Sequence, residues 1–441
     1  MMKMRQLLVA TVVLAALAAT LYWSNHRKPA ETNVSASAET PPKILALNLA
    51  DITGIAIRKK GSEELTLAKN DAGKWQIIAP RQLRADQDAV SSLLTTLSAL
   101  NSDRLIEDKA ANLEQYGLAQ PSLELDVTEK SKKTDKLRIG DDTPSSSAAY
   151  AAIAGDPRVF TVASYTKNGL DKSAQDLRDK RLMTFESDKV TRIELQAKKL
   201  AIEFGRNKEQ WQIVKPGPFR ADGFQVDDLL RNLSDAKMDL TATDEGKKAA
   251  AAFSSGAAVA TAKVTDAAGT QELQLRKNKD DYYARSSVVE GVYKVVGGVS
   301  SALDKGLDDF RNKKLFDFGY ADPEKIEILD GQKSYALSRS GEDWSLNGAK
   351  MDASSVRTLV GKTRDLAASK FPESGFTTAV LGITVTSNDG KRIEKVLIAK
   401  NGDRYVARRE NEPALYELSS GDITELQKSA ADIKPAATPK K

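Results

Sequence analysis

Two residue types are almost missing from the 441-residue chain, which has no cysteine and a single histidine, His26. The lack of cysteine excludes disulfide bonds, thiolate metal ligands, cysteine nucleophiles and a lipid-modified N-terminal cysteine. His26 stands beside the longest apolar run, in a stretch without apolar period, and we expect it to be solvated there. Histidine-based triads and histidine-ligated metal sites are therefore excluded.

Neither sign of charge dominates, because 66 Lys and Arg residues are balanced by 61 Asp and Glu residues, for a formal net charge of +5. Aromatic residues make up only 6% of the chain and do not alternate with basic clusters such as Lys130, Lys132 and Lys133. A nucleic-acid binder usually has a clustered basic face with interleaved aromatic rings. The composition therefore excludes nucleic acid as an expected partner and is ordinary for globular protein.

What the chain does contain is a repeat. The sequence W-Q-I-I-A-P-R-Q-L-R-A-D begins at Trp75, W-Q-I-V-K-P-G-P-F-R-A-D begins at Trp211, and a fainter copy begins at Trp344. Spacings of 136 and 133 residues are those of whole domains rather than of a solenoid repeat. Each Trp lies in a short alternating segment that predicts a strand. We expect the three rings to be core residues rather than sugar-stacking platforms.

An aspartate in each copy predicts the start of a helix. Asp86, Asp222 and Asp352 are each followed by Val at plus four and by two apolar residues at plus seven and plus eight. This spacing places one apolar stripe on one helix face, and aspartate is a good N-cap residue. The sequence therefore predicts three capped helices, each packed on a sheet.

Two further landmarks recur in register. Residues 176–182 (D-L-R-D-K-R-L) match residues 309–315 (D-F-R-N-K-K-L), and a late predicted hairpin carries Tyr150, Tyr283 and Tyr405. The predicted fold is α+β, with three homologous units after an N-terminal membrane anchor. Each unit is an antiparallel meander sheet with a capped helix and a closing helix. The closing helices are predicted over residues 164–181 and 300–310 in the first two units.

The landmarks also set the predicted domain boundaries. Unit one spans residues 44–187, unit two 188–321, and the shorter and more divergent unit three 322–433. Residues 24–43 are rich in Ser, Ala, Thr, Glu and Pro and predict a flexible tether, and the Pro/Ala/Lys-rich residues 434–441 predict a disordered tail.

Residues 1–23 predict a membrane segment. The apolar run over residues 7–23 is at the lower length limit of a transmembrane helix, and Tyr22-Trp23 suits an interfacial aromatic belt. Such an anchor predicts a single-pass inner-membrane protein with its bulk in the periplasm. The alternative is a cleaved signal peptide with Ala16-Leu17-Ala18 as its cleavage pattern, which predicts a periplasmic protein.

Taken together, these motifs resemble a known family. The anchor, the W-x-I-x-x-P…R-A-D helix, Tyr116-Gly117-Leu118-x-x-Pro121, Ile139-Gly140 and the closing D-L-R-D-K-x-L segment are similar to those of the bacterial family called domain of unknown function 4340. The resemblance is clearest over units one and two and fades in unit three. It implies a membrane-anchored protein, often encoded beside ABC-type transport components of the gliding-motility auxiliary kind. It implies no established activity and no catalytic residues.

Motifs for catalysis are weak. Gly361-Lys362-Thr363 lacks the upstream glycine of a phosphate loop, because Val356 takes that place. Neighbouring carboxylates occur at residues 141–142, 280–281 and 308–309, but acid–base hydrolysis needs two carboxylates across a cleft. We therefore expect no enzyme activity, no cofactor and no metal site, and a carboxylate-only hydrolase is the least favoured hypothesis.

Five residues are candidates for contact with a partner or ligand. Arg84 and Arg220 recur two residues before the capping aspartates, either as ligand-binding arginines or as ion-pair or carbonyl contacts that hold the turn. Tyr150, Tyr283 and Tyr405 are candidates if they are exposed.

The first function hypothesis is a non-enzymatic envelope scaffold or accessory subunit that binds a protein partner, with an ABC-type transport system as the family-level expectation. The second is a binding module for envelope polysaccharide or another small ligand.

Overall fold

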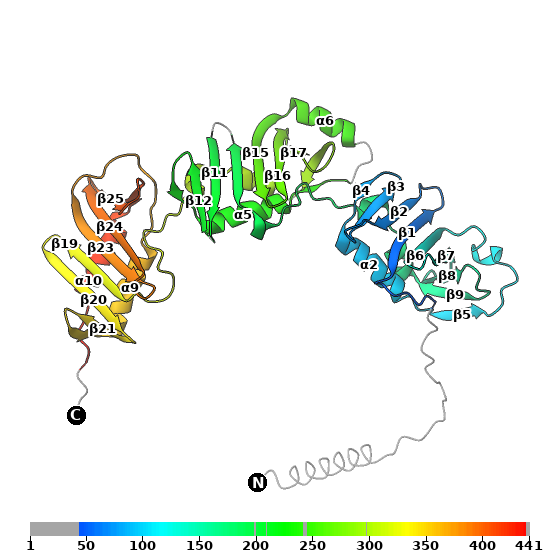
Figure 1. The fold of residues 1–441 in the computed structure, drawn as a ribbon, viewed down its shortest axis with the longest axis horizontal. Helices are drawn as coiled ribbons and strands as arrows, with labels where there is room; N and C mark the ends of the chain where they lie inside the picture. Colours follow the sequence, from blue (N-terminus) through cyan, green and yellow to red (C-terminus); the bar gives the residue numbers. More distant parts are fainter. Residues whose placement is uncertain (1–43, 198–199, 209, 241–244, 297, 438–441) are drawn as a thin grey trace, which may run out of the picture. The chain divides into compact units, whose positions relative to one another are not determined.

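The computed structural model describes residues 44–437 except 198–199, 209, 241–244 and 297. It is an α+β protein with three antiparallel sheets of eight or nine strands, each with helices (Figure 1). Contacts group the chain into two compact parts: Met1–Asp179, which contains sheet one, and Lys180–Lys441, which contains sheets two and three. The predicted anchor and tether lie outside the described residues. Within those residues, no helix is both long and apolar enough to cross a membrane.

Sheet one has the strand order β4-β3-β2-β1-β6-β7-β8-β9-β5, with every neighbouring pair antiparallel. Its strands are β1 Ile52–Lys59, β2 Leu65–Lys69, β3 Trp75–Ala79, β4 Leu83–Arg84, β5 Arg104–Glu107, β6 Leu123–Glu129, β7 Thr134–Asp142, β8 Ala148–Ile153 and β9 Val159–Ala163. Its helices are α2 Gln87–Ser98, the 3₁₀ turn η1 Glu114–Tyr116, α3 Ser164–Leu170 and α4 Ala174–Leu177.

Sheet two repeats this order as β13-β12-β11-β10-β15-β16-β17-β18-β14. Its strands are β10 Arg192–Ala197, β11 Leu200–Asn207, β12 Gln210–Lys215, β13 Phe219–Arg220, β14 Lys237–Met238, β15 Ala257–Asp266, β16 Gly269–Asn278, β17 Asp281–Ser286 and β18 Val292–Val296. Its helices are η2 Ser187–Lys189, α5 Gly223–Ser234, α6 Glu245–Ser255, α7 Val299–Leu303 and α8 Leu307–Phe310.

Sheet three has the order β22-β21-β20-β19-β23-β24-β25-β26. Its strands are β19 Lys325–Asp330, β20 Lys333–Ser340, β21 Asp343–Leu346, β22 Ala349–Met351, β23 Ala379–Ser387, β24 Arg392–Asn401, β25 Arg404–Arg409 and β26 Leu415–Leu418. Its helices are α9 Ala353–Asp365 and α10 Ser420–Ala431. An isolated bridge between Lys370 and Glu417 continues the sheet where β5 and β14 lie in the other two.

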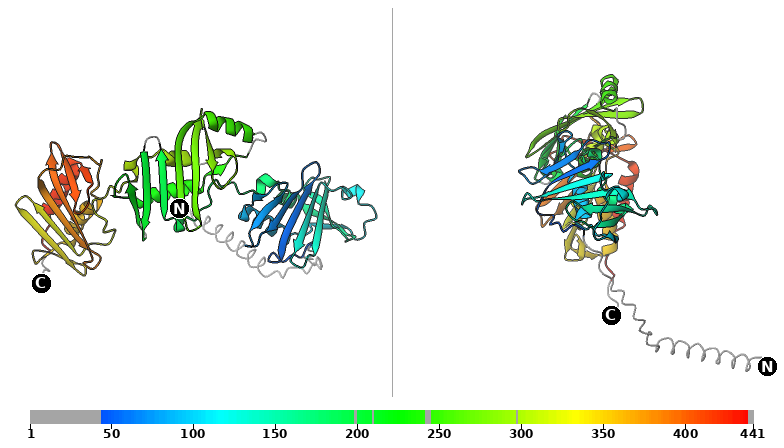
Figure 2. Two further views of the ribbon diagram at one scale, coloured as in Figure 1. Left: turned by 45° about the horizontal axis from the view of Figure 1, so that its top comes forward. Right: turned by 90° about the vertical axis from the view of Figure 1, so that its right-hand side faces the viewer.

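The predicted capped helices are confirmed. Asp86, Asp222 and Asp352 are the N-caps of α2, α5 and α9, and each side chain accepts a backbone N–H from the first turn. The apolar stripe of each helix is buried against its sheet, as are Trp75, Trp211 and Trp344, so these rings are core residues. Figure 2 shows the sheets from two further directions.

The prediction of one continuous closing helix in units one and two is wrong. In unit one the helix is broken between α3 and α4, where Ser173 starts a new cap with Asp176. In unit two it is broken before Gly306, whose N–H donates to Asp309. A local side-chain acceptor competes with the continuing helix at both places. In unit three, α10 is a single 12-residue helix.

Helix α6 was not predicted. It contains the run Ala249–Ala252, a composition that favours helix and could have revealed it. Phe253 and Ala249 of α6 pack with Val292 and the partly buried Tyr283 in a small apolar cluster of their own. The guanidinium groups of Arg276 and Arg285 each lie 5.0 Å from the centre of the Phe253 ring. The helix therefore covers the β16–β18 end of sheet two.

A further repeat, missed in the sequence, begins each unit. Residues 44–47, 182–185 and 315–318 are apolar at their first, second and fourth positions, and all nine of these side chains are buried. The first N–H of each segment donates to the carbonyl of a residue just after the capped helix: Leu100, Ala236 and Leu366. We call these the entry segments. Their recurring apolar spacing was the signal that could have found them.

Matching exit segments, residues 177–179, 310–312 and 434–436, pair with the chain just before each capped helix. Isolated bridges join Ala85 to Arg178, Ala221 to Arg311 and Met351 to Pro435. The backbone N–H of each capping aspartate donates to the first carbonyl of the exit segment, at 2.8 Å in all three units. The hydrogen-bonded chain of unit three therefore extends beyond the predicted boundary at residue 434. Residues 438–441 of the predicted tail lie outside the described residues.

Candidate functional site

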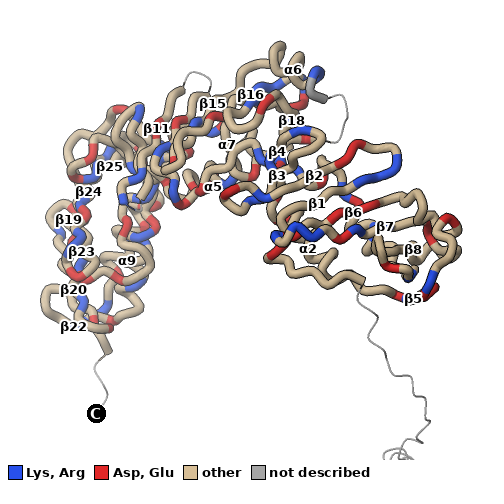
Figure 3. The backbone as a smooth tube through the Cα atoms, turned by 45° about the vertical axis from the view of Figure 1, so that its right-hand side comes forward, with Lys and Arg blue, Asp and Glu red and all other residues tan. Residues whose placement is uncertain are grey.

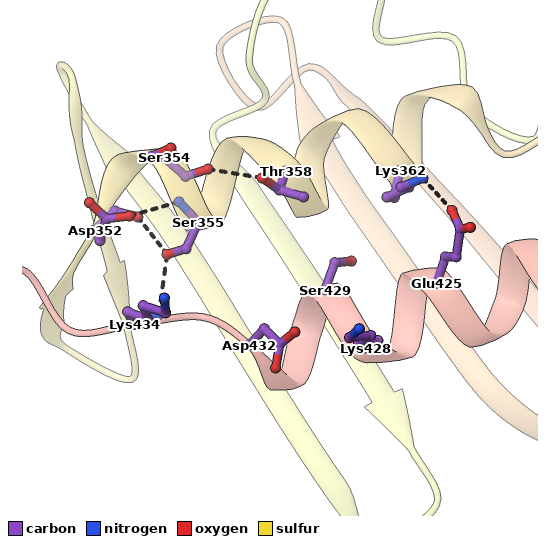
Figure 4. A pocket seen from close by; sticks show the side chains of 10 residues that line it. All are labelled: Asp352, Ser354, Ser355, Thr358, Lys362, Glu425, Lys428, Ser429, Asp432 and Lys434. Carbon is purple, nitrogen blue, oxygen red and sulfur yellow. Dashed lines mark hydrogen bonds and ion pairs between the residues drawn. The ribbon is translucent and has the colours of Figure 1, made fainter.

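Helices α9 and α10 lie side by side in unit three, with a polar groove of about 750 Å³ along them (Figure 4). The groove is lined by hydroxyl and charged side chains of both signs, with no aromatic ring: Asp352, Ser354, Ser355, Thr358, Lys362, Glu425, Lys428, Ser429, Asp432 and Lys434. Helix α10 is continuous, unlike the closing helices of units one and two, and it packs along α9.

Most of these groups serve the local fold. Ser355 donates its N–H to the Asp352 carboxylate at 2.8 Å and its hydroxyl to the Asp352 carbonyl at 2.8 Å, and it accepts the N–H of Lys434 at 3.2 Å. Lys362 and Glu425 form an ion pair across the groove (Figure 4). This hydrogen bond raises the pKa of Lys362 and lowers the pKa of Glu425. The groove can therefore hold a polar ligand, but it does not pair a nucleophile with a base.

An arginine-rich junction joins sheets two and three within the part Lys180–Lys441. Arg220 of β13 forms an ion pair with Asp317 of the third entry segment and donates to the carbonyl of Lys314. Its guanidinium also lies 3.4 Å from Glu412 and 5.9 Å from the centre of the Tyr416 ring. Burial lowers the pKa of Arg220, but the nearby charges of Asp317 and the other acidic groups outweigh burial and raise it.

Glu394 is the buried carboxylate of this junction. Both of its oxygens accept the backbone N–H of Asp317 at 3.1 Å, and Arg409 and Arg392 approach it to 3.1 and 3.3 Å. Arg409 also lies 2.9 Å from Glu412 and donates to the carbonyl of Leu315 at 2.7 Å. The cluster therefore fixes the third entry segment on sheet three through opposite charges and backbone groups.

Arg311 of the second exit segment is held differently. Its guanidinium lies between two rings, 4.2 Å from the centre of Phe219 and 3.7 Å from the centre of Phe371, and the residue is only 8% exposed. Burial lowers the pKa of Arg311, although Asp308 lies 3.4 Å away and partly opposes this effect. Within the described residues its Nε has no hydrogen-bond partner. Stacking between rings from sheet two and from the β26 side of sheet three makes Arg311 a second contact across the junction.

The arginines singled out in the sequence thus make structural contacts. Arg220 makes the ion-pair and carbonyl contacts described above. In the part Met1–Asp179, Arg84 lies 4.0 Å from the buried Asp179, and its carbonyl accepts the N–H of that residue. The contacts of Arg84 are with the first exit segment, whereas those of Arg220 reach the third entry segment and sheet three. A contact of either arginine with a partner or ligand stays a prediction.

The three tyrosines do not occupy equivalent positions. Ala151, Ala284 and Ala407 are equivalent, because each pairs with the aromatic residue of the next strand. Tyr150 and Tyr283 come one residue before this alanine, and Tyr405 comes two residues before it. Since side chains alternate along a strand, Tyr405 faces the core of unit three while the other two face away from their main cores. All three are only partly exposed. The ring of Tyr150 packs 4.9 Å from that of Tyr116.

The neighbouring carboxylates are also engaged locally. Asp142 pairs with Lys167, Asp281 with Lys294 and Asp308 with Arg311. Across the described ranges, no group of three or more His, Cys, Asp or Glu residues is placed to hold a metal ion.

The family model described as Domain of unknown function (DUF4340) matches residues 75–212 and 211–383. The chain belongs to this family. The first DUF4340 segment begins at Trp75 and the second at Trp211, so the start of the model coincides with the start of the repeat. The second match extends past the capped helix of unit three into β23.

Other comparisons add no functional information to the DUF4340 assignment. No curated protein matches the chain. Two solved structures from Pseudomonas aeruginosa, a DNA polymerase sliding clamp and a DNA polymerase III subunit beta, are 8% and 7% identical to it. The matches cover 84% of this chain and 91% and 92% of those chains, with TM-scores of 0.16 and 0.13. At such scores the likeness carries no argument.

An ion-pair network lies on the face of sheet one that points away from the core of this DUF4340 member. Figure 3 shows Lys and Arg interspersed with Asp and Glu along its strands. Arg138 and Lys136 approach Glu124 to 3.2 and 3.3 Å, and Arg58 lies 2.9 Å from it. Burial raises the pKa of Glu124, but the hydrogen bonds from Arg138 and Lys136 outweigh burial, so the pKa lies below the usual glutamate value.

This network predicts a loss of stability in acid. Because the pKa of Glu124 is lower in the folded state, its stabilising effect is present above the unfolded-state pKa and disappears as the pH falls through the folded-state value. We expect the free energy of unfolding of the wild type to fall more steeply below about pH 4.3 than that of Glu124→Gln. Urea titrations at several pH values measure this, with Glu63→Gln, an exposed residue, as control. Equal slopes for Glu124→Gln and the wild type would contradict the assignment.

Proposed function

We propose that the protein is a non-enzymatic, membrane-anchored envelope protein that acts as a scaffold or accessory subunit through protein–protein contacts. The proposal includes three homologous units derived by triplication. It also includes an anchor over residues 7–23 that holds their bulk on the periplasmic side of the inner membrane, with a cleaved periplasmic form as the alternative. The family resemblance favours an ABC-type transport system as the partner.

The observation that carries this proposal is the face of the sheets opposite the capped helices. In sheet three, the side chains of β19, β23 and β24 alternate between the buried core and this second face. On that face, Leu329 and Ile393 are 57% and 67% exposed. Their strands are paired on both sides, so the exposed side chains stand on a rigid surface. Exposed apolar side chains on a rigid, extended surface support a protein partner more than a small ligand.

Charging this face is expected to weaken partner recovery. The variant Leu329→Asp/Ile393→Asp places two carboxylates on the open face without altering the core. After crosslinking in cells and extraction in mild detergent, we expect recovery of transport ATPase or permease subunits to fall at least about tenfold, since a buried unpaired charge costs more than 1.4 kcal/mol. Thr424→Asp, on the exposed side of α10, is the control and leaves recovery unchanged. No stable partner for the wild type would remove the support for the scaffold function.

The polar groove between α9 and α10 favours a second candidate, a module that binds a small polar ligand or an envelope polysaccharide. Its hydroxyl and charged groups suit hydrogen bonding to such a ligand. The lack of an aromatic ring in the lining and the partial burial of the three tyrosines give it less support than the scaffold. Recovery of glycan alone from the crosslinked protein would favour it.

A further inference from the structure

Helix α9 contains a glycine that the fold does not explain. Gly361 lies in the interior of the 13-residue helix, where glycine is the least favourable residue after proline. Within the described part of the chain, a methyl group at this position would meet no heavy atom within 4 Å, and the backbone is not in the left-handed region. Neither close packing nor backbone conformation therefore requires glycine here. Local rules of this kind are most often broken where a residue serves function.

The absence of a side chain at Gly361 leaves a hollow of about 240 Å³ on the surface of the helix pair. Arg357 and Asp365 of α9 line it four residues before and after Gly361, and Asp422 of α10 lines it from the neighbouring helix. The Lys362–Glu425 ion pair borders this hollow and also the groove of Figure 4. Besides this ion pair, the lining of the hollow therefore carries one cation, Arg357, and two carboxylates, Asp365 and Asp422.

An exposed aromatic ring stands next to the same helix. Tyr320 is 93% exposed, yet its backbone is held in place by Arg364 of α9. That guanidinium donates to the carbonyls of Gly319 and Tyr320 at 2.8 and 3.1 Å and to Asp322 at 3.3 Å. Tyrosines on backbone that is already ordered are favoured anchors of protein interfaces, because little entropy is lost when they bind.

Arg357 connects the two features, since it lines the hollow and lies 3.9 Å from Asp322, two residues from Tyr320. Its side chain is 61% exposed, so its charge is available to a partner. A small residue on a helix surface allows a second helix to pack at short distance, because the interaxial distance depends on the side chains at the contact.

We propose that the face of α9 formed by Arg357, Gly361 and Arg364, together with Tyr320, is the docking surface for a helix of a partner protein. The partner helix places an apolar side chain over Gly361, an acidic residue opposite Arg357 and a basic residue toward Asp365 and Asp422. This inference rests on the proposed scaffold function and adds to the open sheet face a second surface, on the helix side of unit three, with one kind of partner.

The test uses the full anchored chain in cells, with Tyr320 replaced by the photo-crosslinking amino acid p-benzoylphenylalanine. A second version carries the crosslinker at Ile393 on the open sheet face. The substitutions Gly361→Trp, which fills the hollow, and Arg357→Glu, which reverses the rim charge, are each combined with both versions. Phe224→Ala, which removes an exposed aromatic ring on α5, is the control.

We expect the adduct at position 320 to fall at least tenfold in both variants and to stay unchanged in the control. The adducted peptide of the partner should come from a helix with an acidic residue. Gly361→Ala serves as a folding check, because it should raise the urea midpoint while reducing the adduct about threefold.

Four outcomes overturn the proposal. One is an adduct that neither variant reduces, and another is an adduct with a second copy of this chain. The third is an adduct at position 393 without one at 320, which removes the α9 surface but leaves the scaffold function standing. In the fourth outcome, adducts form at neither position, which removes both the α9 surface and the scaffold function.

Discussion

Replacing Arg220 with alanine is expected to lower the free energy of unfolding at the junction by about 3 kcal/mol, the lower end of the range for removing one member of a buried ion pair. The substitution removes one of the two arginines that Asp317 and Glu412 share, the other being Arg409, and leaves the Lys314 carbonyl without its Arg220 donor. We expect the lower end of that range of destabilisation because the two carboxylate side chains are still partly exposed to solvent, 25% for Asp317 and 23% for Glu412. Arg409 compensates for part of the loss at Glu412.

The effect is best measured one sheet at a time. Hydrogen exchange along a urea titration reports β12 and β24 separately, and in the wild type we expect one common midpoint for both. In Arg220→Ala the midpoint of β24 should fall below that of β12, because the entry segment of sheet three loses its tie to sheet two. Arg231→Ala, which removes an exposed arginine on α5, should change neither midpoint. A common midpoint in Arg220→Ala would show that the junction does not couple the sheets.

The second large effect is expected for Trp344→Ala, which should cost about 3–5 kcal/mol, the usual range for removing a large aromatic side chain from a core. Trp344 is 1% exposed and lies in the core cluster of unit three, beneath the stripe of α9. Circular dichroism during urea titration measures the change. Ile393→Ala, on the exposed face of the same sheet, is the control and should stay within about 0.5 kcal/mol of the wild type. A loss below 1 kcal/mol for Trp344→Ala would contradict the core assignment.

The sequence predicted the parts of the fold that follow local rules. The capping aspartates and the plus-four, plus-seven and plus-eight spacing located α2, α5 and α9, because N-capping and amphipathic period both depend on residues close in sequence. The Trp repeat located the three sheets for the same reason. The break of the closing helices was missed because it depends on single side-chain acceptors, Asp176 and Asp309, that compete with the helix backbone.

The candidate site was less predictable, because it depends on tertiary contacts. Arg220 was recognised from its recurrence, but its partners Asp317 and Glu412 lie 97 and 192 positions further along the chain. Tyr405 was aligned with Tyr150 from a shared motif, whereas a shift of one position places it on the opposite face of its strand. Gly361 was noticed only as part of a rejected phosphate-loop match, since the absence of a steric reason for a glycine is visible only in three dimensions.

The spacing of the bridges has a mechanical consequence. Arg311 is bridged to Ala221, just after β13 of sheet two, and Lys314, three residues later, is bridged to Ala367, just after α9 of unit three. Three residues span at most about 11 Å when fully stretched, so the connection has little slack. Tension applied to one sheet would therefore reach the next almost without extension of the chain, with the Arg220–Asp317 ion pair and the stacked Arg311 bearing load in parallel with the backbone. Under tension, sheets two and three would therefore behave as one stiff element rather than as two domains joined by a flexible linker.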